Sequence, residues 1–353
     1  MAIGYGITPD VLVKVGGVTA GKNSGISSIK VVSKMGSADS ATIEIDNIKD
    51  ASGTRNLSKI YKSDSVEIQL GYTDKGKEIV FYGTVDKRKP SLTKTSGALL
   101  NIECVGEEFT LLTSQIGKEV SFTNSSLVSI VSGLLTKAGS TLTLNIINPK
   151  SESIGSPVEN PVITFDEEMS YMECFKQLAK DKNYDIVTLA SSTMTWYPKD
   201  EAKGKAILIK YGDNLIAGEV EDSEAFINAV TVKAGKVNEE TTLVHTEKDL
   251  ISLALGVPER GIIIYAPELD TLAAVQERAK SELKTHEGDK VTGNVTVVGS
   301  PDYKKRGLVQ IEDDGAIGLK GIFQIEEVTH NLTKSEGYIC QLKLKQGEVV
   351  ESG

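Results

Sequence analysis

A short block of sequence occurs twice in this chain, and the second copy lies close to the last residue. Residues 91–97 read SLTKTSG and residues 331–337 read NLTKSEG. Each copy lies between two runs in which apolar and polar residues alternate, the pattern of a half-buried β-strand. Turn-flanked strands can resemble each other by chance, but here both neighbouring strands keep their spacing to the shared L-T-K core. The sequence therefore predicts one antiparallel unit built twice, which favours a pseudo-symmetric part of an assembly over an enzyme.

Length and composition limit the classes of protein to consider. A chain of 353 residues favours two or three domains, each with its own core. Its 33 glycines suit many short strands joined by tight turns, and its net charge of −10 argues against a broad basic surface for nucleic acid. No apolar run reaches the ~18 residues of a membrane span. The N-terminus lacks the features of a signal peptide, so we expect no membrane insertion.

Hydrophobic periodicity divides the chain into three parts and predicts an α+β fold that is mainly β. Residues 1–111 and 216–353 consist largely of alternating runs bounded by Gly, Ser and Asp. We expect each of these parts to form a tube-like antiparallel β-barrel or sandwich domain. The second one should also carry a polar mobile loop, residues 236–248, and a helix that Asp270 can cap.

The middle part, residues 112–215, has a different pattern. Apolar residues recur at helical spacing from Leu127 onward, and Ser170 with Glu173 forms an S-x-x-E capping box at the start of a second helix. A predicted hairpin follows, with its turn at residues 191–192. This part should therefore form a small α+β middle domain.

The candidate chemical sites have little support in the sequence. Residues 16–23 approach a phosphate-binding P-loop, but Asn23 replaces the Ser or Thr that would hold magnesium, and a strand-like run follows. The three histidines and three cysteines lack metal-ligand spacing. We therefore expect no cofactor, no metal and reduced core thiols.

Carboxylates and one aromatic residue leave a second class of function open, a cell-wall or glycan hydrolase. Asp166 and Glu168 could act as its carboxylate pair, and Trp196 could stack on a sugar ring. The acidic run is also explained by its place before a helix, where the helix dipole favours negative charge. Two basic runs, residues 86–89 and 304–306, are expected to be solvated and too short to bind nucleic acid.

Four motifs, taken in order, resemble the late control protein D family of phage tail hubs. Related proteins are the baseplate hubs of contractile phages and the hub part of type VI secretion spike proteins. The resemblance spans nearly the whole chain, and it rests on residues 64–72 with 80–85, 170–184, 228–232 and 321–338.

This resemblance implies a non-enzymatic structural role in a phage tail or contractile injection system. Such hubs are homotrimers whose six β units form a pseudo-hexameric ring between the hexameric tail tube and the trimeric spike. The implied partners are the tube protein, the spike protein and other baseplate proteins, and DNA or effector would pass through the lumen without specific binding. The implied location is the virion tail or injection particle, assembled in the host cytoplasm.

The repeated turns are the residues that this implied function singles out. We expect six of them to occupy equivalent places around the ring: Leu92, Lys94, Gly97, Leu332, Lys334 and Gly337. Because the sequence ends soon after the second copy, any spike or wall-degrading region is expected on separate chains. A glycan-binding tail accessory protein remains a further alternative, again through Trp196.

Overall fold

The described part of the protein consists mainly of β-strands, and the expected α+β, mainly β class is confirmed. The computed structural model describes residues 8–21, 25–47, 56–93, 97–147, 162–190, 192–199, 205–222, 226–234, 243–254, 256–267, 269, 271–287, 291–312 and 321–346.

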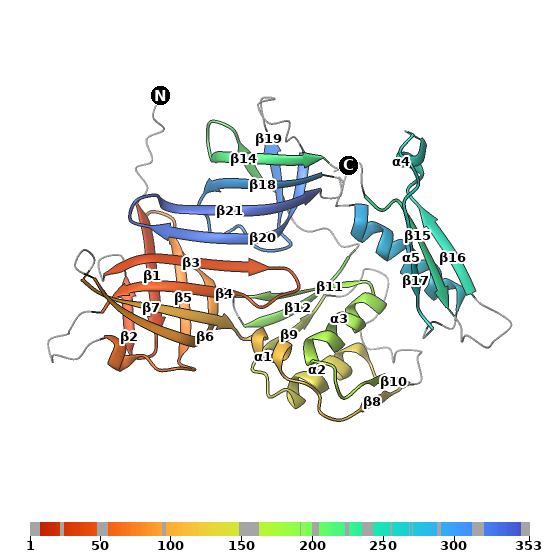
Figure 1. Ribbon diagram of the computed structural model, residues 1–353, viewed down its shortest axis with the longest axis horizontal. Coiled ribbons are helices and arrows are strands. Elements are labelled where there is room, and N and C mark those ends of the chain that lie inside the picture. The colour runs from red at the N-terminus through yellow and green to blue at the C-terminus, as the bar shows by residue number, and fades with distance from the viewer. Residues whose placement is uncertain are drawn as a thin grey trace.

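Thirteen of the described strands form one continuous sheet with contributions from both ends of the chain (Figure 1). We call its two parts unit 1 and unit 2. Unit 1 contains β1 (Pro9–Val15), β2 (Val18–Gly21), β3 (Ile26–Lys34), β4 (Ser40–Asp46), β5 (Ser65–Tyr72), β6 (Gly76–Thr93) and β7 (Gly97–Gly106), with a 3-10 helix at Asn56–Lys59. Unit 2 contains β13 (Ile207–Lys210), β14 (Leu215–Asp222), β18 (Val291–Val298), β19 (Leu308–Glu312), β20 (Gly321–Thr333) and β21 (Gly337–Gln346).

The two units have the same strand order. It is β3-β4-β7-β6-β5-β1 in unit 1 and β14-β18-β21-β20-β19-β13 in unit 2. All of these neighbours are antiparallel except β13, which runs parallel to β19. The units meet through β3 and β20, which pair antiparallel and lie side by side in Figure 1. The duplication that the sequence predicts is therefore also present in the fold.

Alternating side chains supply a core that the two units share. On strands such as β1, β4 and β18 every second residue is buried, as the period of an extended chain requires. Val13, Ile43 and Ile68 of unit 1 belong to the same apolar cluster as Val297 and Ile325 of unit 2. Each such side chain contributes about 1.5–3 kcal/mol by leaving water, so this shared core holds the units together.

The middle unit packs below the sheet in Figure 1 and has a core of its own. It contains α1 (Glu108–Thr113), β8 (Val120–Thr123), α2 (Leu127–Lys137), β9 (Thr143–Ile146), β10 (Val162–Phe165), α3 (Tyr171–Asp181), β11 (Tyr184–Leu189) and β12 (Thr193–Pro198). The predicted capping box is confirmed: Ser170 Oγ accepts from the Glu173 N–H, and the Glu173 carboxylate accepts from the Ser170 N–H. The predicted hairpin is β11–β12.

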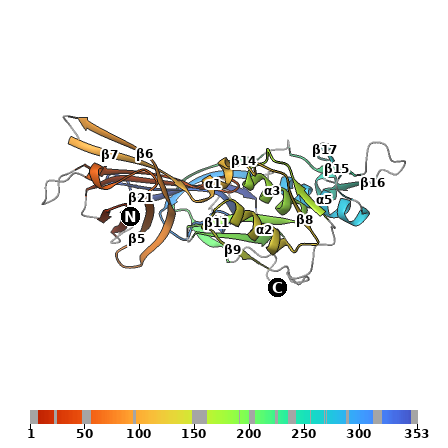
Figure 2. The ribbon, with the colours of Figure 1, turned by 90° about the horizontal axis from the view of Figure 1, so that it is seen from below.

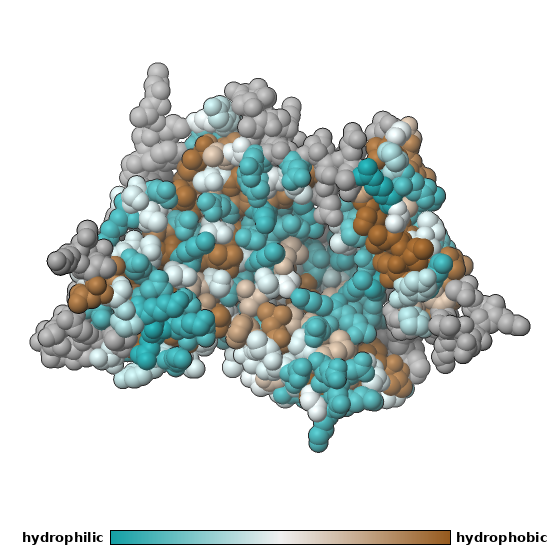
Figure 3. Space-filling model, in the orientation of Figure 1, coloured by the Kyte–Doolittle hydropathy of each residue, from teal (hydrophilic) through white to brown (hydrophobic). Residues whose placement is uncertain are grey.

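A smaller unit is inserted between β14 and β18, in the place of the short β3–β4 turn of unit 1. It contains β15 (Ala229–Ala234), β16 (Leu243–Lys248), α4 (Leu250–Ala254), β17 (Gly261–Tyr265) and α5 (Leu272–Glu287). Helix α5 packs on one face of this small sheet. On the other face Val244, Ile263 and Tyr265 are exposed. Figure 3 shows an apolar patch over the β15–β17 end of the molecule.

The polar stretch 236–248 was expected to be a loop, but Leu243–Lys248 is strand β16, because its alternating residues pair with β15 along their whole length. The remainder of that stretch, and Asp270, lie outside the described residues. The predicted boundaries after residues 111 and 215 stay predictions, although β13 lies before residue 215 and pairs within unit 2.

Candidate assembly surface

The repeated sequence block is the turn of two hairpins that share one register. In β6–β7 the last pair is Thr93 with Gly97, and in β20–β21 it is Thr333 with Gly337. Both hairpins also have a bulge eight residues before that pair, after Val85 and after Ile325. A bulge redirects a strand and increases its twist, so the two hairpins bend at the same place.

The six residues predicted to be equivalent fall on these hairpins, with one outside the described residues. Gly97 and Gly337 have φ values of +70° and +75°, a conformation that glycine adopts without steric cost. Leu92 is 81% exposed, whereas Leu332 packs against the shared core. Lys334 lies exposed in its turn, and Lys94 is not among the described residues. Their equivalence within a ring remains a prediction.

The pairing between the two units occupies the outer edge of the β20–β21 hairpin and leaves the corresponding edge of the β6–β7 hairpin open. Residues 327–333 of β20 pair with residues 28–34 of β3, and Lys34 lies opposite Glu327, with Nζ 3.9 Å from Oε2. The matching segment of β6, residues 87–93, pairs only with β7 among the described strands. That difference in pairing accounts for the exposure of Leu92.

The edge of unit 2 that corresponds to β3 is also open. Strand β14 pairs only with β18 in the part of the chain that the structure describes. Both strands have a bulge at the corresponding position, after Leu215 in β14 and after Ile26 in β3. At that bulge Ile216 is 54% exposed. Each unit therefore has an open strand edge of the kind that the other unit uses in the join.

A buried ion cluster fixes the join. Lys305 of unit 2 lies 2.7 Å from Asp39 and 3.6 Å from Glu108, measured between the ammonium nitrogen and the nearest carboxylate oxygens. Ser33 donates a hydrogen bond to Asp39 at 2.8 Å. Burial raises the pKa of Asp39 and of Glu108, and the Lys305 ammonium opposes that rise. One cation thus links unit 2 to unit 1 and to the first helix of the middle unit.

Arg306 anchors the same loop to the middle unit. Its Nε donates to Asp185 at 3.2 Å and its Nη2 to the Pro198 carbonyl at 3.1 Å, while the guanidinium lies 4.3 Å from the centre of the Tyr197 ring. The prediction that residues 304–306 are solvated is therefore wrong for two of the three. Only Lys304 is exposed, because tertiary partners far away in sequence enclose Lys305 and Arg306.

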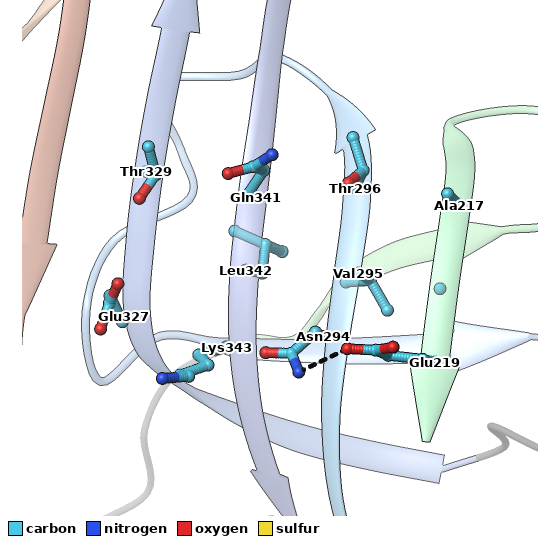
Figure 4. A pocket seen from close by; sticks show the side chains of 11 residues that line it. Ala217, Glu219, Asn294, Val295, Thr296, Glu327, Thr329, Gln341, Leu342 and Lys343 are labelled. Carbon is cyan, nitrogen blue, oxygen red and sulfur yellow. Dashed lines mark hydrogen bonds between the residues drawn. The ribbon is translucent and has the colours of Figure 1, made fainter. Parts of the chain in front are cut away.

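The outward face of the sheet is polar on both sides of the join. A shallow hollow of about 430 Å³ lies over β14, β18, β21 and β20. Figure 4 shows the side chains that line it. Glu219 accepts a hydrogen bond there from Asn294 at 2.9 Å, and Glu327, Gln341 and Lys343 complete the rim. On unit 1 the same face carries Lys87 and Lys89, and both contact Glu103. This face offers paired charges and amides in place of a deep ligand pocket.

The residues of the glycan alternative are not gathered into a site. Trp196 is fully buried, with Phe175 and Tyr184 against its ring, so the expectation that it could stack on a sugar is wrong. Asp166 and Glu168 are exposed in the turn before α3. Residues 16–17 form the β1–β2 turn, while Asn23 lies outside the described residues.

The described residues contain no group of three His, Cys, Asp or Glu side chains placed to share a metal ion. None of the helices in the described ranges combines the length and hydrophobicity that a bilayer crossing needs. Cys104, Cys174 and Cys340 are unbridged and buried, as predicted. Burial raises the pKa of the Cys104 and Cys340 thiols to about 12.

Sequence reasoning found the basic run at residues 86–89, but it missed the acidic residues of β14 and the position of both sets on open strand edges. Glu219 and Glu221 alternate on β14, and Lys87 and Lys89 alternate on β6. Like charges at every second position of a strand lie on one face, a signal that was available in the sequence. The sequence did not show which strands pair with β14 and β6, and so it did not show that these charges lie on open edges.

No family model and no curated protein matches this chain. Solved structures do. The 43 kDa tail protein of prophage MuSo2 from Shewanella oneidensis has a TM-score of 0.72 at 17% identity, covering 96% of this chain and 98% of its own. The tail protein from Neisseria meningitidis MC58 has a TM-score of 0.74 at 16% identity, covering 96% and 97%.

A third similar structure comes from a secretion machine. The E. coli c3393 protein, described as a component of the type VI secretion system with structural similarity to the T4 tail proteins gp27 and gp5, has a TM-score of 0.56 at 10% identity, covering 96% of this chain and 77% of its own. At these identities the likeness concerns the fold. The expected resemblance is thereby confirmed at the level of the fold: this chain has the fold of phage tail proteins.

Proposed function

We propose that this protein is a structural hub of a phage tail or related injection machine, in which three copies close a pseudo-hexameric ring. The observation that carries the proposal is the edge-to-edge join of two like units, which leaves one open edge of each kind on the chain. A join that repeats between copies is heterologous, and such contacts form closed rings when the rotation allows it. Three chains would then present six similar units.

The proposed place of the ring is between a hexameric tail tube and a trimeric spike. Two like units in each of three chains would match the sixfold symmetry of the tube, and the three chains would match the threefold symmetry of the spike. Other baseplate proteins would bind around the ring. The likeness to tail proteins and to a type VI secretion component supports this setting. Assembly in the host cytoplasm before incorporation into the particle follows from the same proposal.

The outward face of the sheet fits the wall of a channel. Its charges are balanced by neighbours within the sheet, as for Lys89 with Glu103 and Lys34 with Glu327. A face of this kind would let DNA or an effector pass without specific binding. The proposed role is therefore geometric and non-enzymatic, and the exposed Asp166 and Glu168 need no catalytic part in it.

Particle size tests this proposal directly. Light scattering of the purified chain, followed by electron microscopy, should give a threefold particle with a central opening. Tube and spike proteins from the same tail should bind opposite ends of that particle. A strictly monomeric protein, even after both proteins are added, would contradict the proposal.

A further inference from the structure

We infer that the seam between copies is a charge-selected strand pair, in which β14 of one chain pairs antiparallel with residues 87–93 of β6 in the next. This inference rests on the proposed ring and adds its partner surface, register and selectivity. The partner is a second copy of this chain.

The register follows from the join inside the chain. There, Thr333 lies opposite Ser28 and Lys34 lies opposite Glu327. The hairpin bulges match β6 to β20, and the bulges after Ile26 and Leu215 match β3 to β14. Applying the β20–β3 register to β6 of one copy and β14 of the next places Lys89 opposite Glu221 and Ser91 opposite Glu219.

Charges on the two open edges are complementary in this register. Glu219 and Glu221 are exposed on β14, and the side chains of Lys87 and Lys89 are 57% and 61% exposed on β6. Glu221 would lie directly across from Lys89 and diagonally from Lys87, distances at which opposite charges on a sheet attract. Within the chain Glu103 contacts both lysines and Asp86 also contacts Lys87, and both lysine side chains remain more than half exposed toward the open edge.

The edges that meet inside the chain have the opposite polarity. There β3 carries Lys30 and Lys34, and β20 carries Glu327. Because β3 and β20 are already paired inside each chain, the competing seams join like open edges of two copies. Two β6 edges would bring Lys87 and Lys89 of both chains together, and two β14 edges would bring Glu219 and Glu221 of both chains together. Both mismatches repel, so the charges select alternation of unit 1 and unit 2.

Two further features of the open edges agree with a selected seam. Pro90 lies within the β6 edge, where a missing N–H discourages indiscriminate strand addition. Leu92 would lie opposite Gly218, next to Ile216 at the bulge. The two most exposed apolar side chains of these edges would thus cover each other, which gives the seam an apolar end beside its charged one.

Charge reversal tests the seam. Lys87→Glu with Lys89→Glu, or Glu219→Lys with Glu221→Lys, should each raise the concentration at which half the protein is trimeric by roughly tenfold or more, corresponding to about 1.4 kcal/mol or more. Combining all four changes should restore assembly to within roughly threefold of the original chain, since opposite charges again face each other. Lys118→Glu with Lys137→Glu, on the exposed surface of the middle unit, changes net charge equally and should leave assembly unchanged.

Cysteine pairs test the register independently. Ser91→Cys with Glu219→Cys should form an intermolecular disulfide in the ring, because directly opposed residues come within bonding reach. Ser91→Cys with Glu221→Cys, displaced by two residues, should not. Failure of the unaltered chain to form any ring overturns the proposed function and the seam together. A ring that is indifferent to the edge reversals, or that the fourfold exchange does not restore, overturns the seam and leaves the function standing.

Discussion

Lys305 and Asp39 form a buried ion pair between the two halves of this chain, with the ammonium nitrogen 2.7 Å from the carboxylate oxygen. They lie 266 residues apart in sequence. Glu108 at the start of α1 shares the same cation. The contact thus joins unit 1, unit 2 and the middle unit at one point, and it holds β3 against β20 in the register that we propose the ring repeats.

Removing the cation of this cluster should destabilise the fold strongly. Lys305→Met leaves two buried carboxyl groups without their shared partner, so the free energy of unfolding should fall by about 3–5 kcal/mol. Urea unfolding followed by circular dichroism measures this. Lys304→Met is the matched control, because Lys304 and its partner Glu78 are both about half exposed and their pair should contribute less than about 1 kcal/mol. Equal losses for both variants would contradict the assigned role.

His330 should make stability fall in mild acid. It is buried beside the Tyr338 hydroxyl, 2.8 Å from Nδ1, and burial lowers its pKa from 6.5 to about 4. The unfolded chain therefore binds a proton between pH 6.5 and 4 that the folded chain does not. Stability from this group is fully present above pH 6.5 and is lost as the pH falls to about 4, by about 3 kcal/mol.

Comparison with His330→Gln isolates this effect. Both proteins share all carboxylates, so their acid titrations cancel in the difference between the two stability curves. The variant should show a smaller loss of unfolding free energy between pH 6.5 and 4, whatever its stability at neutral pH. Parallel curves over that interval would show that His330 titrates normally in the folded protein.

Local patterns in the sequence predicted many of the strands. The pairing between distant strands depends on long-range contacts, and local patterns did not predict it. Alternation identified the two strand-rich parts of the chain and the L-T-K spacing identified both hairpins, because those signals depend on a few adjacent residues. The likeness of β3 to β14 escaped notice, since it consists of a shared bulge and strand order with little similarity of side chains. Strand pairing between distant segments is set by the whole sheet.

The same reason explains the errors at Lys305, Arg306 and Trp196. A run of basic residues is usually solvated, but Arg306 has a φ of +69° in a tight loop and is enclosed by β11 and β12. Trp196 is on a short strand whose burial depends on α3 packing over it. Composition indicates which residues can carry charge or stack on a ligand, and only tertiary packing determines which of them reach solvent.

The two repeated turns should respond alike to loss of their glycine. Gly97→Ala and Gly337→Ala each place a side chain at positive φ, at a cost of about 1 kcal/mol. No steric clash adds to this, since an added methyl group would meet ordinary van der Waals space at both positions. Thermal unfolding of each variant measures the loss. Gly261→Ala, in a strand with room for the methyl group and without positive φ, should be neutral or slightly stabilising. A marked difference between the two turn variants would argue against their equivalence.

Trp196 should behave as a core residue and should not report glycan binding. It is the single tryptophan of the chain, and it is enclosed by Phe175 and Tyr184 with ring centres 6.2 Å and 6.1 Å away. Its fluorescence should therefore be blue-shifted and insensitive to added peptidoglycan fragments. Trp196→Ala should lower the free energy of unfolding by about 3–5 kcal/mol through loss of packing. Saturable quenching by an oligosaccharide would revive the glycan-binding alternative, because a fully buried indole can respond in that way only if the sugar opens the middle unit.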